Sequence, residues 1–227
     1  MIHWEDITLV VFDVDGTLYD QRSLRVRMAR DMALSAVARR SVRFIAVVAA
    51  YRRIRERLGE REAGDFESVL VAETAAAAGC SVEVVRAVVA EWIETRPLPY
   101  LARCRYPGLP SLFAGLRRSG KIIGVFSDYP AQAKLAALDL SADLVACAPD
   151  PGIGYLKPHP RGLESLIAAA GVTPGQTLLI GDRHDRDGLA AQRAGARILL
   201  RSSKPIDGWQ TFRRYDDPLF SPILTEC

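Results

Sequence analysis

The segment Leu9-Val10-Val11-Phe12-Asp13-Val14-Asp15-Gly16-Thr17-Leu18 joins a short apolar run to two carboxylates and a glycine. A continuous apolar run is typical of a strand that helices cover on both faces of a sheet. Ligands bind beyond the carboxyl ends of the strands in an open parallel sheet, so Asp13 and Asp15 are expected at a ligand site. Like charges this close are unfavourable unless a cation or a proton lies between them. Aspartate and glycine are also common in ordinary turns, so the rest of the chain has to decide between a ligand site and a turn.

Four further short apolar runs also resemble buried strands. Segments with helical patterns lie between the later runs, and each of these segments ends at a glycine. The runs comprise residues 122–126, 144–148, 177–180 and 197–200. Strands that alternate with helices predict an α/β fold with a Rossmann-like parallel sheet and helices on both of its faces. We expect this core to be discontinuous and to comprise residues 1–18 and 106–227. For residues 201–227 the sequence leaves open whether they wrap the core, form a dimer contact or are partly mobile.

Residues 19–105 separate the first strand from the rest of the sheet, and their apolar side chains recur at helical spacing. This segment is therefore predicted to form an inserted, all-helical cap domain. Residues 19–106 contain 16 arginines and 11 acidic residues, a net charge of +5, so the cap could recruit an anionic group of a substrate. Arg22 and Arg25 lie closest to the first acidic motif and are the first candidates for that role. The alternative is that the arginines simply lie on solvated helix faces.

The composition is that of an ordinary soluble globular protein, with 49% hydrophobic and 25% charged residues. A net charge of +3 is too weak to predict a nucleic-acid partner. The apolar run 44–51 is far shorter than the roughly twenty residues that a membrane-spanning helix needs, so we expect no membrane span. The first residues lack the pattern of a targeting signal, and the four cysteines are scattered without metal-ligand spacing, which favours a cytoplasmic location.

A second acidic group follows the run 177–180. Asp182 comes two residues after that run, and the loop behind it contains Asp185 and Asp187. Oxygen ligands that come from two strand ends suit a hard cation such as Mg²⁺. Taken alone, a glycine and an aspartate after a strand fit the start of the next helix equally well.

Two further motifs suit a phosphate group. Ser127 and Asp128 follow the run 122–126, where a hydroxyl and the next backbone N–H groups could hold a phosphate oxygen. Lys157 precedes a predicted helix and would supply a fixed positive charge for a phosphoryl group. Either motif alone could be an ordinary loop.

Together these four motifs resemble the haloacid dehalogenase superfamily, specifically its phosphatase branch with a helical cap, such as the phosphoglycolate phosphatases. The resemblance covers the predicted sheet, with all four motifs in order. It implies that Asp13 is a nucleophile that forms an aspartyl-phosphate and that Asp15 is the general acid and base. It also implies a Mg²⁺ ion, held by Asp13, Asp182 and Asp187 and by the backbone carbonyl of Asp15.

The same resemblance implies that Ser127, Asp128 and Lys157 bind the phosphoryl group. Asp128 stands where asparagine is frequent in the family, and Arg183 stands where a small hydroxyl residue is frequent. Arg183 could therefore point at the substrate or at the cap, and it is a further candidate for substrate specificity. Because Asp185 is a third acid in the same loop, Asp187 is chosen as the metal ligand by its spacing only.

Other activities of the superfamily are separated by single residues. A halide leaving group needs no proton, so an acid at Asp15 favours phosphate esters over dehalogenation. A phosphonatase needs a lysine in its cap, and residues 1–120 contain none. A phosphosugar mutase shares all four motifs and stays an alternative, as does a non-catalytic binding or regulatory module. The prediction is thus a Mg²⁺-dependent phosphatase for a small phosphorylated metabolite, with the natural substrate and the oligomeric state left open.

Overall fold

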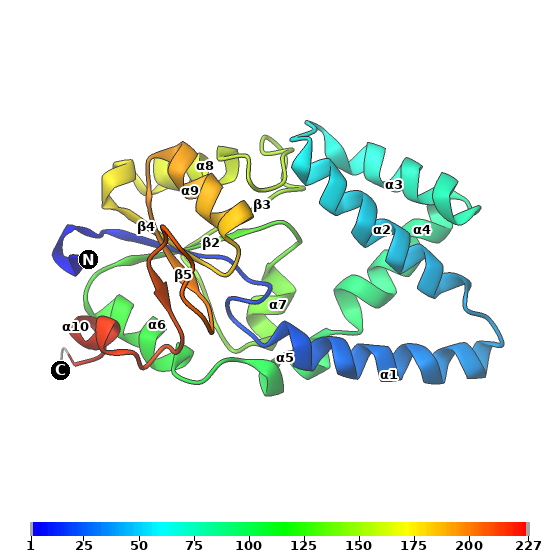
Figure 1. Ribbon diagram of the computed structural model, residues 1–227, viewed down its shortest axis with the longest axis horizontal. Helices are drawn as coiled ribbons and strands as arrows, with labels where there is room; N and C mark the ends of the chain where they lie inside the picture. Colours follow the sequence, from blue (N-terminus) through cyan, green and yellow to red (C-terminus); the bar gives the residue numbers. More distant parts are fainter. Residues whose placement is uncertain (1, 226–227) are drawn as a thin grey trace.

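The computed structural model describes residues 2–225, in which six parallel strands form one sheet in the order β3-β2-β1-β4-β5-β6 (Figure 1). The strands are β1 (Leu9–Phe12), β2 (Ile122–Ser127), β3 (Leu144–Cys147), β4 (Thr177–Gly181), β5 (Arg197–Arg201) and β6 (Thr211–Phe212). Phe12 at the end of β1 is aligned with Val125 of β2 and with Ile180 of β4. The loops that follow these three central strands therefore leave the sheet at the same edge.

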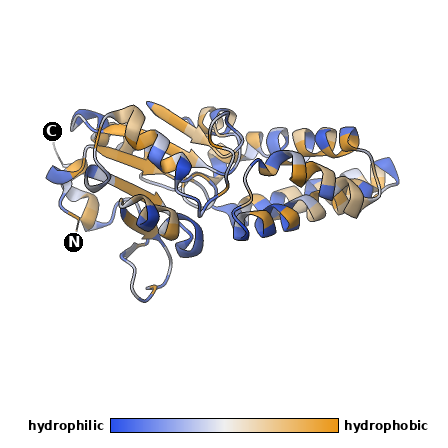
Figure 2. Cartoon of the chain, turned by 90° about the horizontal axis from the view of Figure 1, so that it is seen from above, coloured by the Kyte–Doolittle hydropathy of each residue, from blue (hydrophilic) through white to orange (hydrophobic). Residues whose placement is uncertain are grey.

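Helices cover both faces of the sheet. They are α6 (Leu109–Arg118), α7 (Gln132–Ala137), α8 (Arg161–Ala170), α9 (Leu189–Ala194) and α10 (Ser221–Leu224). Successive residues of a strand point to opposite faces, so Val10 and Phe12 of β1 pack with α6, α7 and α10, whereas Leu9 and Val11 pack with α8 and α9. All four side chains are fully buried, and the strands are strongly hydrophobic in Figure 2. Burial on both faces is the physical reason for the continuous apolar run that predicts β1.

Between β1 and α6 the chain forms a helical cap that lies to one side of the sheet, at the right of Figure 1. Its helices are α1 (Gln21–Arg39), α2 (Arg43–Glu60), α3 (Phe66–Ala78), α4 (Val82–Val89) and α5 (Leu98–Cys104). A π-helical segment, Ala90–Thr95, continues α4 and stacks Trp92 on Phe44 of α2, with ring centroids 4.6 Å apart. The predicted fold class, a Rossmann-like α/β core with an inserted helical cap, is confirmed.

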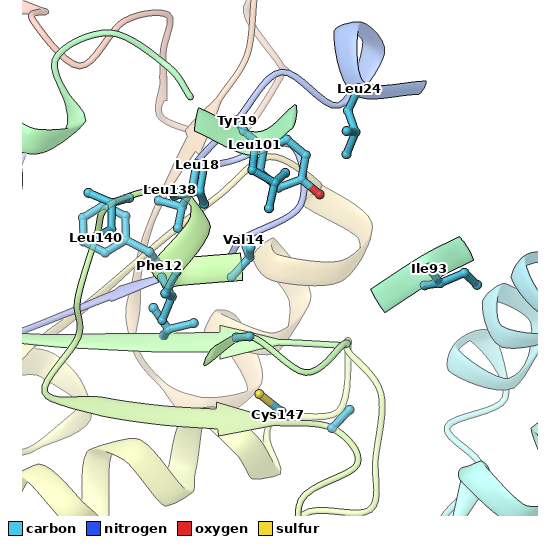
Figure 3. Close-up of a cluster of buried hydrophobic side chains, with 14 of the residues drawn as sticks. Phe12, Val14, Leu18, Tyr19, Leu24, Ile93, Leu101, Leu138, Leu140 and Cys147 are labelled. Carbon is cyan, nitrogen blue, oxygen red and sulfur yellow. The ribbon is translucent and has the colours of Figure 1, made fainter. Parts of the chain in front are cut away.

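Two crossing chain segments connect the cap to the core. The Asp20 N–H group donates to the Cys104 carbonyl at 2.8 Å, and the Tyr106 N–H group donates to the Leu18 carbonyl at 3.1 Å. Leu18 belongs to the same buried cluster as Leu101 of α5, and Figure 3 shows these two side chains close together at the junction. The segments that enter and leave the cap are therefore held side by side.

The cap also contacts the core on a second side. Arg193 of α9 donates to Glu62, which follows α2, at 2.8 Å. The Asp65 N–H group, just before α3, donates to the Gly154 carbonyl of the core at 3.0 Å. The cap thus reaches across the edge of the sheet at which β1, β2 and β4 end.

The chain after β5 wraps the core. The Tyr215 hydroxyl donates to the Thr17 carbonyl at 2.8 Å, and the indole N–H of Trp4 donates to the Leu219 carbonyl at 2.8 Å. The rings of Tyr215 and Phe220 pack together, with centroids 5.9 Å apart. Residues 202–225 thus wrap the core, which is one of the roles that the sequence leaves open; residues 226 and 227 lie outside the described part. Tyr215 supports the acidic loop after β1 directly.

No single helix within residues 2–225 combines the length and the apolar character needed to cross a membrane. α3 and the helical run Val82–Cys104 reach that length and composition only when taken together, and they are bent by 105° relative to each other.

Candidate active site

The loop after β1 places Asp13 at the carboxyl edge of the sheet. Asp13 is 6% exposed, and its Oδ2 atom accepts a hydrogen bond from the Thr17 hydroxyl at 2.9 Å. Gly16 has a φ angle of +99°, and a Cβ atom there would lie 2.2 Å from Oδ2 of Asp182. Only glycine fits this position, because a side chain would be strained and would collide with the second acidic loop. The turn at Gly16 thus brings the first and second predicted motifs into contact.

Asp13, Asp182 and Asp187 form an acidic cluster, with one carboxylate oxygen of each within 4.8 Å of the others. Asp187 lies in a π-helical turn, His184–Gly188, and its Oδ2 atom accepts from the backbone N–H groups of Asp182 at 3.2 Å and Arg183 at 3.0 Å. These hydrogen bonds fold the loop so that the Asp187 side chain turns back towards Asp182. The structure therefore places Asp187 in the cluster, as its spacing predicts.

Burial and mutual repulsion raise the pKa values of two carboxyl groups in this cluster. The pKa of Asp13 rises to about 7, first because burial disfavours the charged form, and Lys157 opposes the rise. The pKa of Asp182 rises to about 8, first because of burial and then because of the charges of Asp13 and Asp187. A divalent cation would relieve this repulsion, and carboxylate oxygens are the hard ligands that Mg²⁺ prefers. The cluster therefore fits the predicted metal.

The Lys157 ammonium group lies between two members of the cluster. Its Nζ atom is 2.5 Å from Oδ1 of Asp13 and 2.7 Å from Oδ1 of Asp187, and it donates to the Phe126 carbonyl at 3.2 Å. Although burial alone would lower the pKa of Lys157, the charges of Asp13 and Asp187 raise it above its ordinary value. Lys157 is therefore a fixed positive charge directly beside Asp13.

The two other predicted phosphate-binding residues lie at the end of β2. Ser127 is fully buried, and its hydroxyl accepts from the Tyr129 N–H group at 3.2 Å. Oδ1 of Asp128 accepts from the backbone N–H group of Lys157 at 2.9 Å, so this side chain positions the Lys157 loop. Because the Asp128 carboxylate would repel an anion, only its backbone N–H group suits a phosphate oxygen.

The Asp15 carboxylate lies outside the acidic cluster and is held by two other side chains. Nζ of Lys134 is 2.7 Å from both carboxylate oxygens, and the Tyr19 hydroxyl donates to Oδ1. Burial alone would raise the pKa of Asp15. The charge of Lys134, its hydrogen bonds and the hydrogen bond from Tyr19 instead hold the pKa of Asp15 below its ordinary value. The two acids of the first motif therefore have opposite pKa shifts, and only the Asp15 backbone carbonyl suits the predicted metal contact.

A cavity of about 370 Å³ lies between the core and the cap, and the side chains of Asp13, Asp15 and Asp182 line it. From α1, Arg25 also lines the cavity and donates to Gln21 at 2.6 Å. Arg22 does not line the cavity, which corrects the prediction for this residue. Neighbouring residues of a helix point about 100° apart, so α1 turns Gln21 and Arg25 inwards and Arg22 outwards.

Arg183 lines the cavity and also contacts the cap. Its Nη2 atom is 2.6 Å from Glu56 of α2 and 2.6 Å from Asp185. The neighbouring Arg186 is 5% exposed and donates to the backbone carbonyls of Lys157 at 2.7 Å and Glu56 at 2.9 Å. The structure thus shows the contact of Arg183 with the cap, and its place in the cavity lining leaves the substrate contact as a prediction.

Sequence reasoning missed several side chains at the site. They are Thr17, Tyr19, Arg55, Lys134 and Arg186. Lys134 lies on α7, a helix of six residues whose pattern is too short to predict. One signal could have found it: the chain has only four lysines against 26 arginines, and two of the four hold carboxylates of the first motif.

The family of the chain follows from a comparison with protein-family models. The model described as haloacid dehalogenase-like hydrolase matches residues 7–195. The chain belongs to this family of hydrolases. Among curated proteins, the pyrophosphatase PpaX of Bacillus mycoides (strain KBAB4) is 31% identical over 92 residues, which are 38% of this chain. The match spans about two fifths, 41%, of the length of that relative.

Solved structures of the family share the fold of this hydrolase. The 2-haloacid dehalogenase from Pseudomonas syringae pv. Tomato DC3000 superposes with a TM-score of 0.65 at 21% identity, covering 96% of this chain and 98% of that chain. The HAD-hydrolase YfnB from Bacillus subtilis, bound to magnesium, superposes with a TM-score of 0.68 at 16% identity, covering 96% of this chain and 99% of that chain. At these identities the likeness shows the fold alone.

Proposed function

We propose that this hydrolase cleaves phosphate monoesters of small metabolites, with Mg²⁺ bound at the acidic cluster. The observation that carries the proposal is the separation of two acids on one loop. Asp13 is buried beside Lys157, whereas Asp15 is held apart from it by Lys134. Ester cleavage leaves an alkoxide that must be protonated, but a halide leaves without a proton. A second acid at the site therefore favours phosphate esters over dehalogenation.

Asp13 acts as the nucleophile in the proposed reaction. Its carboxylate oxygen forms a bond to phosphorus while the bond from phosphorus to the ester oxygen breaks, and Asp15 gives its proton to that departing oxygen. In the second half of the reaction, a water gives a proton to Asp15 and its oxygen bonds to phosphorus. The bond between Asp13 and phosphorus then breaks and inorganic phosphate leaves. Asp15 releases to the solvent the proton that it took up when the substrate bound, so both acids return to their starting states.

Asp15 has to be protonated for the first half of the reaction and ionised for the second. Lys134 and Tyr19 stabilise the ionised form in the absence of a substrate. A phosphoryl group beside Asp15 adds negative charge, which raises the pKa of Asp15 and favours the proton that it has to donate. Departure of the alcohol then leaves Asp15 ionised and ready to accept a proton from water.

Asp13, Asp182, Asp187 and the backbone carbonyl of Asp15 would hold the cation. When bound, Mg²⁺ would neutralise negative charge on the phosphoryl oxygens and on the nucleophile. Lys157, whose Nζ atom lies 2.5 Å from Oδ1 of Asp13, supplies a second positive charge. Phosphoryl transfer depends mainly on such positioning and charge neutralisation, which this loop arrangement supplies.

Release of inorganic phosphate from p-nitrophenyl phosphate and a panel of phosphorylated metabolites, at fixed Mg²⁺, tests this function. We expect turnover that EDTA abolishes, that Asp13→Asn abolishes, and that Asp15→Asn reduces by about 10²–10⁴. Asp185→Asn is the matched control, because this acid lies in the same loop as Asp187 but outside the cluster.

Three results would contradict the proposed function. Phosphate release that survives Asp13→Asn would assign the activity to another site or to a contaminant. An isomerised phosphate ester without free phosphate would indicate a mutase. Halide release from 2-haloacids, with no phosphate release from any ester, would indicate a dehalogenase.

A further inference from the structure

The arginines that line the cavity differ in their partners. Of those from the core, Arg183 forms ion pairs with Glu56 and Asp185, and Arg186 lies 3.1 Å from Glu56. Those from the cap are Arg25, Arg52 and Arg55. Within residues 2–225, none of these three has a carboxylate within ion-pair distance. The cap side of the cavity therefore carries positive charge that the protein itself does not neutralise.

α2 presents one face to the cavity. Arg52, Arg55, Glu56 and Gly59 all line it, and their spacing of three and four residues places them on the same side of the helix. Arg52 is exposed, so water can solvate its charge. Arg55 is only 7% exposed, so its charge is largely removed from water. The two arginines thus place positive charge on this face of α2, in water at Arg52 and buried at Arg55.

Arg55 has two hydrogen-bond donors without a partner. Its Nη1 atom donates to the Tyr51 hydroxyl at 3.2 Å, whereas Nε and Nη2 are buried and have no acceptor among residues 2–225. These two atoms lie on the same edge of the planar guanidinium, and their N–H bonds are parallel. That edge matches the two oxygens of a carboxylate in the bidentate geometry that arginine favours.

The guanidinium of Arg55 is held in place by aromatic rings. Its central carbon lies 4.0 Å from the ring centroid of Tyr129 and 5.1 Å from that of Phe66. Cation–π contacts with these rings offset part of the cost of burying the charge, but they leave the donor edge unsatisfied. Arg55 lines the cavity, and an anion there that reaches this edge would satisfy both donors.

We propose that Arg55, assisted by Arg52, binds a carboxylate of the substrate, so that this hydrolase acts on small phosphomonoesters that also carry a carboxylate. Binding of the phosphoryl group is part of the proposed function, on which this proposal depends. Binding of the carboxylate is inferred from the side chains of the cap alone. Leu24 and Met28 of α1 line the cavity as well, so a short carbon chain between the two anionic groups would meet apolar side chains. A volume of about 370 Å³ is at the lower end for ligand sites and suits a small metabolite.

Two probes of nearly equal shape test the carboxylate site. 3-Phospho-D-glycerate has a carboxylate where sn-glycerol 1-phosphate has a hydroxymethyl group, and the two have the same configuration at carbon 2. We expect kcat/KM to be about ten- to a hundred-fold higher for 3-phosphoglycerate, which is the range for a bidentate charged hydrogen bond. Calorimetry with the Asp13→Asn protein and Mg²⁺ should show the same ratio in Kd, because this measurement needs no turnover.

Variants on α2 identify the residue responsible. Arg55→Met should reduce the ratio between the two probes to about one, and Arg55→Lys, which keeps a positive charge but lacks the parallel donors, should keep only a small part of it. Arg52→Met should have a smaller effect in the same direction. Arg53→Met is the matched control, because Arg53 is exposed on α2 and does not line the cavity. Melting temperatures establish that each variant is folded.

The outcomes separate this proposal from the proposed function. Equal Kd values for the two probes, or a ratio that Arg55→Met, Arg55→Lys and Arg52→Met all leave unchanged, would overturn the carboxylate site. If p-nitrophenyl phosphate is still hydrolysed in that case, the phosphatase function stands without it. If no ester is hydrolysed but the Kd ratio is present and lost in Arg55→Met, the carboxylate site stands and the phosphatase function fails.

Discussion

Lys134 determines the charge of a residue that is 119 positions away in the chain. Its ammonium contacts both oxygens of Asp15, and the two side chains are 9% and 19% exposed. The pKa of Asp15 is therefore lowered, even though burial alone would raise it. A single side chain thus keeps the proposed general base ionised until a substrate arrives.

Replacing Lys134 with methionine should destabilise the protein by about 3 kcal/mol at pH 7, because the Asp15 carboxylate stays buried without a counter-charge. A lowered pKa in the folded state gives stability that is present above the ordinary aspartate pKa and is lost as the pH falls through the folded value. The difference in the free energy of unfolding between Lys134→Met and the native protein should therefore shrink below about pH 4. Urea unfolding from about pH 3.5 to about pH 7.5, a range that includes the ordinary aspartate pKa, measures this difference in the free energy of unfolding.

Lys204→Met is the control for this experiment, because Lys204 is exposed. It should leave the free energy of unfolding within about 0.5 kcal/mol of the native value at every pH. A Lys134→Met difference that is as large at the lowest pH as at neutral pH would show that lost packing, rather than the charge of Asp15, is responsible.

The loop between β4 and α9 is the element that completes the acidic cluster. Its π-helical turn brings Asp187 back onto Asp182, and the turn at Gly16 brings Asp13 against both. The hydrogen bonds from the backbone of this loop to Asp187 hold that carboxylate close to those of Asp13 and Asp182. The element is therefore incomplete, in electrostatic terms, without a positive charge beyond that of Lys157.

Mg²⁺ affinity should rise with pH between about 6 and 8.5, and binding should release protons. The reason is that Asp13 and Asp182, with pKa values of about 7 and about 8, are protonated in part of this range and have to ionise to bind the cation. Calorimetry in two buffers with different ionisation enthalpies measures both effects. Asp182→Asn should weaken binding strongly, and Asp185→Asn should not.

The same pKa values predict how Mg²⁺ changes the melting temperature. Because both values are raised in the folded protein, stability from these groups is present at low pH and is lost as the pH rises through 7 and then 8. The increase in melting temperature on adding Mg²⁺ should therefore be larger at about pH 8.5 than at about pH 6. An increase that is equal at both values, or larger at the lower one, would contradict the electrostatic account of the cluster.

On the scale of the whole molecule, the cap is joined to the core by the crossing segments at one side and by ion pairs at the other. Glu56 of α2 is central to the second contact, because Arg183 and Arg186 both reach its carboxylate. These two arginines belong to the loop that carries Asp182 and Asp187. The position of the cap is thus linked physically to the loop that holds the acidic cluster.

Glu56→Gln should weaken this contact and favour a more open arrangement of cap and core. We expect KM to rise about two- to five-fold, in line with about 0.5–1 kcal/mol for a partly exposed ion pair, and the radius of gyration to increase in small-angle scattering. Glu73→Gln is the matched control, because Glu73 pairs with Arg57 entirely within the cap. A Glu56→Gln protein with native KM and native radius of gyration would show that the ion pairs do not hold the cap.

The fold and the position of the candidate site could be predicted from local patterns in the sequence. β1 is a continuous apolar run because helices cover both faces of the sheet, and Asp13 and Asp15 follow it because the loops at the strand ends form the site. The order of the motifs placed Asp182 and Lys157 correctly near Asp13. A helical pattern of almost ninety residues was enough to predict the cap.

Only the tertiary structure decided which charges meet across the site. Lys134 reaches Asp15 over 119 positions, and Arg183 reaches Glu56 over 127 positions. Helical periodicity predicts which face of a helix is apolar, but it does not predict which of the many polar residues in the cap turns inwards. The prediction of Arg22 failed for this reason, and Arg55 was missed for the same reason. The sequence by itself determined the fold class and the loops that form the candidate site, because strand and loop patterns are local. The packing of the cap on the core determined the partners of each charge, because those contacts exist only once the chain has folded.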